Sequence, residues 1–76
     1  MKIQLESTTQ ITEVNGVPAR VWEGTTETGI KVIALITRIA ISIDEDPEVH
    51  DQFRKELSEC KAPSAEVAVY PLRMIL

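Results

Sequence analysis

The chain has few of the residues that enzymes and metal sites use. Its 76 residues include one cysteine, Cys60, and one histidine, His50. A single cysteine excludes an internal disulfide, and the two residues together give none of the spacings of a zinc site. Cys60 also falls on the predicted apolar side of a helix, where a thiol is buried and unreactive. We therefore expect no catalytic residue, no metal, no cofactor and no enzyme activity.

Basic charge is also scarce. Eight Lys and Arg residues stand against twelve Asp and Glu residues, which gives a formal net charge of −4. Proteins that bind a phosphate backbone normally present a basic face, so we expect no DNA partner. The N-terminus has no apolar signal segment, and the longest apolar run, residues 30–43, is interrupted by Lys31 and Arg38 and is too short to cross a bilayer. We expect a cytoplasmic protein that does not enter a membrane.

Residues 30–43 dominate the fold that the sequence predicts. The run is rich in β-branched side chains, which fit a pleated strand better than a helix. Both of its alternating faces are largely apolar, and Thr37 is the polar exception in one row. A strand that is apolar on both faces is normally central in a sheet and covered on both sides. We therefore predict a central strand over residues 30–43.

A tight hairpin is predicted before this strand. Residues 2–14 alternate between apolar and polar side chains, with a predicted bend in the polar middle, and Asn15 and Gly16 follow. Asn-Gly between two strands favours a two-residue turn because both positions need a positive φ. Two registers are open. A strict turn places Arg20 on the apolar face of the first strand. A bulge at Pro18, which cannot donate to a ladder, would instead give a core row of Val17, Ala19 and Val21.

A second hairpin is predicted around Gly29, which suits the left-handed position of a three-residue loop. This loop sets the register between the second strand and residues 30–43. The pairs it predicts are Thr26 with Ile30, Glu23 with Ile33, Trp22 with Ala34, Val21 with Leu35, Arg20 with Ile36, Ala19 with Thr37 and Val17 with Ile39.

The same register predicts a candidate binding surface. It brings Arg20, Trp22 and Arg38 together on the sheet face away from the helix, with Thr37 in the neighbouring row. An indole beside guanidinium groups can stack on a planar ring and bind phosphate or carboxylate, and Trp and Arg are common anchors of protein interfaces. The candidate binding residues are thus Arg20, Trp22, Thr37 and Arg38. Alternatively, Trp22 covers a second small core and the arginines lie at its rim.

A helix is predicted after the central strand. Asp46 is a suitable N-cap, Pro47 suits the first helical position, and residues 61–63 end the helix. Its apolar stripe is Val49, Phe53, Leu57 and Cys60. Capping and the helix dipole explain the acidic residues of this region better than a cation site does, because the glycine of a calcium-binding loop is missing.

The predicted fold is a single α+β domain over residues 1–76. An antiparallel meander of three strands carries one helix packed on one face, and the apolar residues 67–76 form a fourth strand that pairs within the chain or with a partner chain. A domain this small has a thin core, and without a disulfide or metal it often gains stability by association. We therefore expect a homodimer or a higher homo-oligomer that buries the second sheet face.

Several segments resemble a known group of proteins. They are residues 1–9, 15–24, 36–40, 63–67 and 71–76, which begin with Met-Lys-Ile-Gln-Leu-Glu and end with Pro-Leu-Arg-Met-Ile-Leu. Together they resemble small, functionally unassigned proteins of tailed phages and prophages of Gram-negative bacteria. The resemblance covers nearly the whole chain but includes no motif of known chemistry. It implies only a genomic context, in which small proteins outside the virion genes are often accessory factors.

The function expected from these observations is non-enzymatic binding. The first hypothesis is a phage accessory protein, with counter-defence as one role, that captures a host protein or a small anionic ligand through the candidate binding residues. The second is a structural or assembly protein that acts by self-association, because of its two-faced apolar strand and apolar tail. A small enzyme is the third hypothesis, and it would need a polar pocket around His50.

Overall fold

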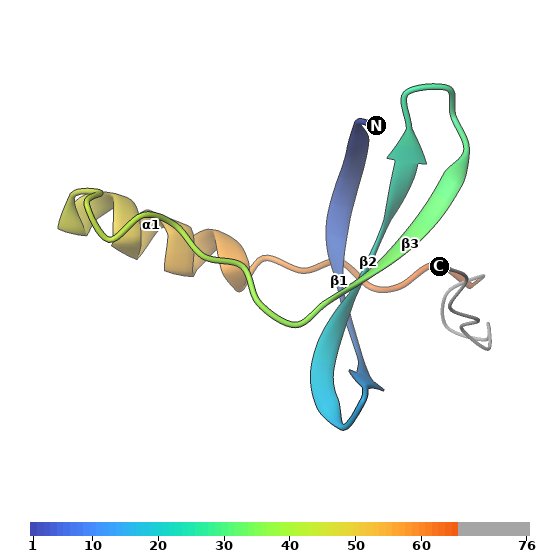
Figure 1. Cartoon of the computed structure of the whole chain (residues 1–76), viewed down its shortest axis with the longest axis horizontal. Helices are drawn as coiled ribbons and strands as arrows, with labels where there is room; N and C mark the ends of the chain where they lie inside the picture. The colour runs from blue at the N-terminus through green and yellow to red at the C-terminus, as the bar shows by residue number, and fades with distance from the viewer. Residues whose placement is uncertain (66–76) are drawn as a thin grey trace.

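A computed structural model describes residues 1–65 of the chain, and its elements form a meander followed by a helix (Figure 1). The strands are β1 (Ile3–Val14), β2 (Val17–Thr26) and β3 (Lys31–Ile36), and the helix is α1 (Pro47–Leu57). The sheet is antiparallel with the order β1-β2-β3. These elements confirm the α+β class and the three-stranded meander.

The first hairpin has the predicted tight turn. Asn15 and Gly16 have φ angles of 51° and 81°, and Val14 pairs with Val17 across them. Ile11 pairs with Arg20, which is the register of a strict two-residue turn. The side chains of Ala19 and Val21 are nevertheless the buried ones of β2, at 2% and 0% exposure. Two residues of the row predicted under the alternative register are thus in the core, whereas the third, Val17, is 49% exposed, and no bulge forms at Pro18.

The irregularity in this hairpin lies in β1. Ser7 pairs with Trp22 and Ile11 with Arg20, so β1 advances four residues where β2 advances two. β1 thus has two extra residues at this place. Because two is an even number, odd-numbered residues of β1 lie on the same face of the sheet before and after the irregularity. The interruption coincides with the bend predicted in the polar middle of β1. It places Thr8 at the centre of the molecule, where its side chain is fully buried.

The second hairpin confirms the predicted register. Gly29 has a φ angle of 88°, and the pairs from Thr25 with Lys31 to Arg20 with Ile36 are formed. The backbone N–H of Thr26 donates to the carbonyl of Ile30 at 2.9 Å. The predicted pairs beyond Ile36, Ala19 with Thr37 and Val17 with Ile39, are absent because β3 has ended.

The prediction of one strand over residues 30–43 is therefore wrong in length and place. Its strand part ends at Ile36, and β2 is the central strand of the sheet. Pro18 gives a physical reason. The backbone N–H of Thr26 donates to Ile30, on the β3 side. Because successive residues of a strand direct their N–H and C=O groups to alternate sides, all even-numbered residues of β2 direct theirs toward β3. Pro18 would stand opposite Arg38 and has no N–H to donate to it. The hydrogen bonds between β2 and β3 therefore end at the preceding bonded pair, Arg20 with Ile36.

Gly24 allows β1 and β2 to lie close together. A Cβ atom at this position would be 1.7 Å from the carbonyl oxygen of Gln4 and 2.9 Å from the Cα of Leu5. Both are backbone atoms, so a larger residue would have to push the strands apart. The residue is required for its lack of a side chain and not for an unusual φ angle.

The core lies between the sheet and a segment that crosses it, residues 59–64, which we call the crossing segment. Lys61 forms a parallel bridge with Thr8 at the outer edge of β1. The Lys61 N–H donates to the Ser7 carbonyl at 3.1 Å, and the Thr9 N–H donates to the Lys61 carbonyl at 3.0 Å. The segment then continues to Glu23 on β2. Figure 1 shows it in orange, running from the end of α1 across the strands.

The helix begins where predicted but does not pack on the sheet. Pro47 is its first residue, and the Asp46 carbonyl accepts bonds from Val49 and His50, although the Asp46 side chain makes no capping bond. Figure 1 shows α1 projecting from the sheet, with its N-terminal end farthest away. None of its side chains is buried. The prediction of a helix packed on one sheet face is therefore wrong for residues 1–65.

The helix also ends earlier than predicted, at Leu57. Ser58 follows as the C-cap, and its hydroxyl donates to the Lys55 carbonyl at 2.6 Å. The next residues leave the helix because β1 binds their backbone at Lys61. Cys60 is consequently outside the helix and only half-buried, which corrects its predicted place in a helical core. The predicted fourth strand, residues 67–76, lies outside the described residues.

Candidate binding surface

One face of the sheet carries the candidate residues of β2, and we call it the Trp22 face. Cross-strand neighbours in an antiparallel sheet point to the same side. Ser7, Trp22 and Ala34 form one such row, as do Ile11, Arg20 and Ile36. Trp22 and Arg20 are half-buried, whereas Ile11 is exposed. The opposite face carries Val21, Glu23 and their neighbours, and the crossing segment reaches Glu23 there after its first residues contact the Ser7 side chain at the edge of the Trp22 face.

Arg20 has a structural role in the sheet. Its guanidinium Nη1 donates to the carbonyl oxygen of Thr8 at 2.7 Å. The Thr8 hydroxyl donates in turn to the Val21 carbonyl at 2.6 Å and accepts from the Gln10 N–H at 3.3 Å. Irregular backbone in the middle of a strand leaves polar groups that need partners. Arg20 and Thr8 therefore satisfy the backbone around the β1 irregularity, and only part of the guanidinium is available to a ligand.

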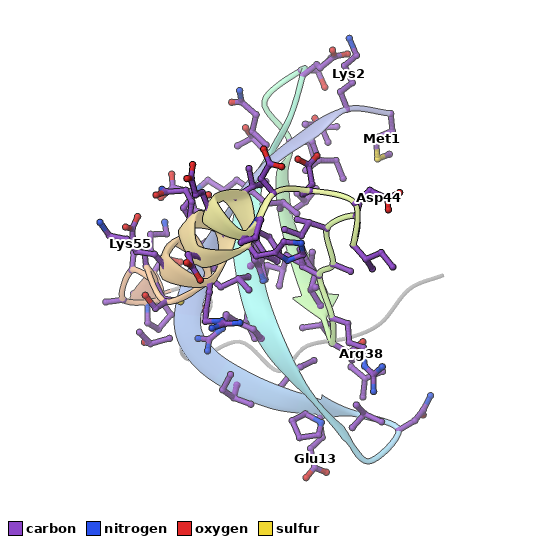
Figure 2. The ribbon with its side chains drawn as sticks, turned by 90° about the vertical axis from the view of Figure 1, so that its left-hand side faces the viewer. Met1, Lys2, Glu13, Arg38, Asp44 and Lys55 are labelled. Atoms are coloured by element: carbon purple, nitrogen blue, oxygen red, sulfur yellow. The ribbon has the colours of Figure 1, made fainter. Side chains whose placement is uncertain are left out.

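Thr37 and Arg38 lie beyond the end of β3. Both are exposed, and neither belongs to the sheet. Figure 2 shows the Arg38 side chain past the end of β3, directed away from the ribbon. The structure thus brings Arg20 and Trp22 together on one strand, but it does not hold Thr37 and Arg38 in the same sheet row. The predicted cluster is reduced to a two-residue centre on β2 with Arg38 at the margin.

The opposite face has an ionic contact that the sequence analysis did not identify. The Glu23 carboxylate pairs with the Lys61 ammonium and accepts a hydrogen bond from the Ser64 backbone N–H at 3.3 Å. The Glu23 side chain is 12% exposed and that of Lys61 is 44% exposed. The Lys61 hydrogen bond lowers the pKa of Glu23 below its usual value, and the Glu23 carboxylate raises the pKa of Lys61. The pair attaches the crossing segment to β2.

Thr8 is the second residue that sequence analysis missed. It sits in the polar middle of β1, and its neighbours Ser7 and Thr9 have similar chemistry. Nothing in the sequence distinguishes the one that is fully buried. Ser7 in turn donates to the Glu59 carbonyl at 3.1 Å and to the Cys60 thiol at 3.5 Å. The bend was predictable from this polar patch, but its docking partner was more than fifty residues away.

The residues considered for catalysis and metal binding do not form a site in residues 1–65. His50 is half-buried on α1, and the thiol of Cys60 accepts its hydrogen bond from Ser7. Within this part of the chain no three His, Cys, Asp or Glu side chains gather closely enough to hold a metal ion. No helix among the described residues is long and apolar enough to cross a membrane.

Comparison of the chain with family models, with curated proteins and with solved structures gives no match. The candidate surface has to be judged on its own geometry.

Proposed function

We propose that this chain is a non-enzymatic binding protein that captures a protein partner through the Trp22 face and the adjoining Arg38. The observation that supports it best is that Trp22 shares one side of the sheet with Ala34, Ile36 and the exposed Ile11, while the crossing segment binds Glu23 on the other side. A half-buried Trp that shares a face with apolar side chains and Arg has the composition of an interface centre.

The biological setting we propose is a phage accessory protein, with counter-defence in the host cytoplasm as one role. Its support is the resemblance of residues 1–9, 15–24 and 71–76 to small phage and prophage proteins. A host protein is the partner that this setting favours. The binding would not involve DNA, because the net charge of −4 opposes contact with a phosphate backbone.

A small anionic ligand is the second candidate partner. Arg38 is exposed, and among residues 1–65 it makes no hydrogen bond or ion pair. A guanidinium in this state can bind phosphate or carboxylate with two parallel hydrogen bonds. Trp22 would then stack on a planar ring of the same ligand.

The test is capture from infected-cell lysate, with both proteins and small molecules identified by mass spectrometry. Trp22→Ala should weaken binding of the captured partner by roughly 30-fold and Arg38→Ala by about tenfold, the range for central and marginal interface residues. Arg54→Ala is the matched control, since Arg54 is also an exposed arginine but lies on α1. Circular dichroism should be unchanged in all three variants. Equal binding by the wild type and both Trp22→Ala and Arg38→Ala would refute the proposal.

A further inference from the structure

One long edge of the sheet has no partner strand among residues 1–65. β3 is the last strand in the order β1-β2-β3, and it lies at the right-hand edge in Figure 1. The outer edge of β1, by contrast, is hydrogen-bonded at Ser7 and Thr9 to Lys61 of the crossing segment. No described residue forms a backbone bridge to the outer side of β3. The two edges therefore differ in how much of their backbone is paired.

The backbone groups on the open edge can be assigned to residues. In an antiparallel strand, successive residues direct their N–H and C=O groups to alternate sides. Thr26 donates to Ile30, so the even-numbered residues of β3 face β2. Ile33 and Leu35 then direct their N–H and C=O groups outward, and they make no hydrogen bond on that side. Each offers a donor and an acceptor to an added strand.

β3 lacks the features that usually protect an edge. Its residues from Val32 to Ile36 are all apolar, and it contains no proline and no bulge. Its one charge, Lys31, is at the beginning of the strand. Native proteins normally block such an edge with charges, proline or a covering segment. An edge of this kind pairs readily with another extended chain.

The exposed area of the molecule is large enough for a second copy to be the partner. The chain exposes 6338 Å². A compact monomer of 8.5 kDa is expected to expose roughly 4,700 Å². The difference of roughly 1,600 Å² per chain is more than the ~800 Å² that each partner buries in a standard stable interface. The chain thus has the surface that a dimer would remove from water.

We propose that β3 pairs antiparallel with β3 of a second copy, so that two meanders form one continuous sheet of six strands. In such a pair, opposite residues point to the same face, so the register must join positions of equal parity. A register centred on Ala34 pairs it with itself and pairs Ile33 with Leu35 of the second copy. It gives only apolar pairs from Val32 to Ile36 and keeps Lys31 outside them.

This arrangement is isologous and closes at two copies, because the pairing uses up both open edges. Ile33 of each copy donates to, and accepts from, Leu35 of the other. The Trp22 face of both copies lies on one side of the six-stranded sheet, because the register joins positions of equal parity. The dimer is therefore independent of the proposed partner capture, and either can fail without the other.

The first test is the mass of the chain in solution, measured by sedimentation velocity over a range of concentrations. The wild type should sediment as a dimer. Ile33→Pro should shift it to the monomer and raise the dissociation constant at least about tenfold, because it removes two symmetric hydrogen bonds. The fold of the protomer should survive, since this N–H faces away from β2. Ile33→Thr is the matched control: it keeps the N–H and the β-branched shape, and it should remain dimeric.

The second test fixes the register and does not depend on a proline. In a Cys60→Ala background, Ala34→Cys places one thiol beside its symmetry mate at a pair without hydrogen bonds, where Cα atoms are closest. Glutathione disulfide should oxidise the two thiols to a cross-linked dimer. Val32→Cys is the control and should stay unlinked, because its opposite residue is Ile36.

Three outcomes would overturn the proposal. A wild type that stays monomeric at millimolar concentration excludes the dimer. An Ile33→Pro variant that is folded and still dimeric shows that another surface holds the copies together. Cross-linking through Val32→Cys in preference to Ala34→Cys excludes the register.

Discussion

The sheet and the projecting helix contrast in how their structure is determined. In the sheet, a turn sets the register of each hairpin: Asn15 and Gly16 form the first turn, and Gly29 is in the second. Contacts between segments then bury Thr8, Ala19 and Val21. α1 has a good start at Pro47 and a regular apolar stripe, yet none of its side chains is buried. Local sequence rules were sufficient for both elements. They did not determine what either element packs against.

The contrast predicts that stability resides in the sheet. The largest loss is expected for Gly24→Ala, because the new Cβ would meet the backbone of Gln4 and Leu5. We expect about 3 kcal/mol of lost unfolding free energy, the upper range for overpacking. Urea denaturation measures it. Gly29→Ala is the control: it has open space but a positive φ, and it should cost only about 1 kcal/mol. Equal losses would show that β1 and β2 can separate without penalty.

A second prediction compares the two regions directly. Val21→Ala removes a fully buried side chain and should cost about 2 kcal/mol. Phe53→Ala removes a larger side chain from α1, but it should cost less than about 1 kcal/mol because the helix buries no residue. Thermal and urea unfolding of both variants provide the comparison. If Phe53→Ala proves the more destabilising, the helix has a partner surface and the contrast fails.

The third prediction concerns the irregular part of β1. Thr8→Val keeps the shape of the side chain but removes the hydroxyl that bonds to Val21 and Gln10. Leaving these buried backbone groups unpaired should cost about 1.5 kcal/mol. Thr9→Val, at the neighbouring exposed position, should change stability by less than about 0.5 kcal/mol. Hydrogen exchange of the Gln10 amide should accelerate in the Thr8 variant alone.

The smallest effect is expected from the ionic contact, and it depends on pH. The lowered pKa of Glu23 means that its stabilising contribution is present above the pKa of the unfolded chain and is lost as the pH falls through the folded pKa. The pKa of Lys61 is raised, so the stabilising contribution of its charge is present below the pKa of the unfolded chain and is lost as the pH rises through the folded pKa. The wild type should therefore exceed Glu23→Gln in unfolding free energy near neutral pH, and the difference should vanish in acid. If the difference in unfolding free energy between the wild type and Glu23→Gln is the same at every pH, Glu23 stabilises the fold by something other than its charge.

The parts of the fold that sequence predicted are those set by neighbours in the chain. Both turns, the register of β2 with β3 and the start of α1 were predicted because Gly, Asn and Pro restrict φ locally, whereas two registers stayed open for the first hairpin. The length of β3 was not, since an apolar run to Ile43 suggested a longer strand. The end of β3 at Ile36 is explained by Pro18 of the adjacent strand, which has no N–H to donate at the next bonding position. Ile43 is instead 89% exposed.

The candidate site was predicted in part for the same reason. Arg20 and Trp22 share a face because the register of β2 with β3 is correct. Thr37 and Arg38 were assigned to that sheet only because the strand was predicted to continue to residue 43. β3 ends at Ile36, so neither residue belongs to the sheet. The pairing of Glu23 with Lys61 and the burial of Thr8 depend on a contact between distant segments, which a single sequence does not specify.

The bridge between the crossing segment and β1, formed by the bonds of Lys61 with Ser7 and Thr9, has a consequence for how the chain folds. It closes a loop of more than fifty residues, whereas each hairpin closes over only a few. Closing a long loop costs more conformational entropy and is slower than closing a short one. During synthesis, both hairpins can form before residues 59–64 are made, but the contacts of the crossing segment with β1 and β2 cannot. The outer edge of β1 therefore stays unpaired until the crossing segment has been made.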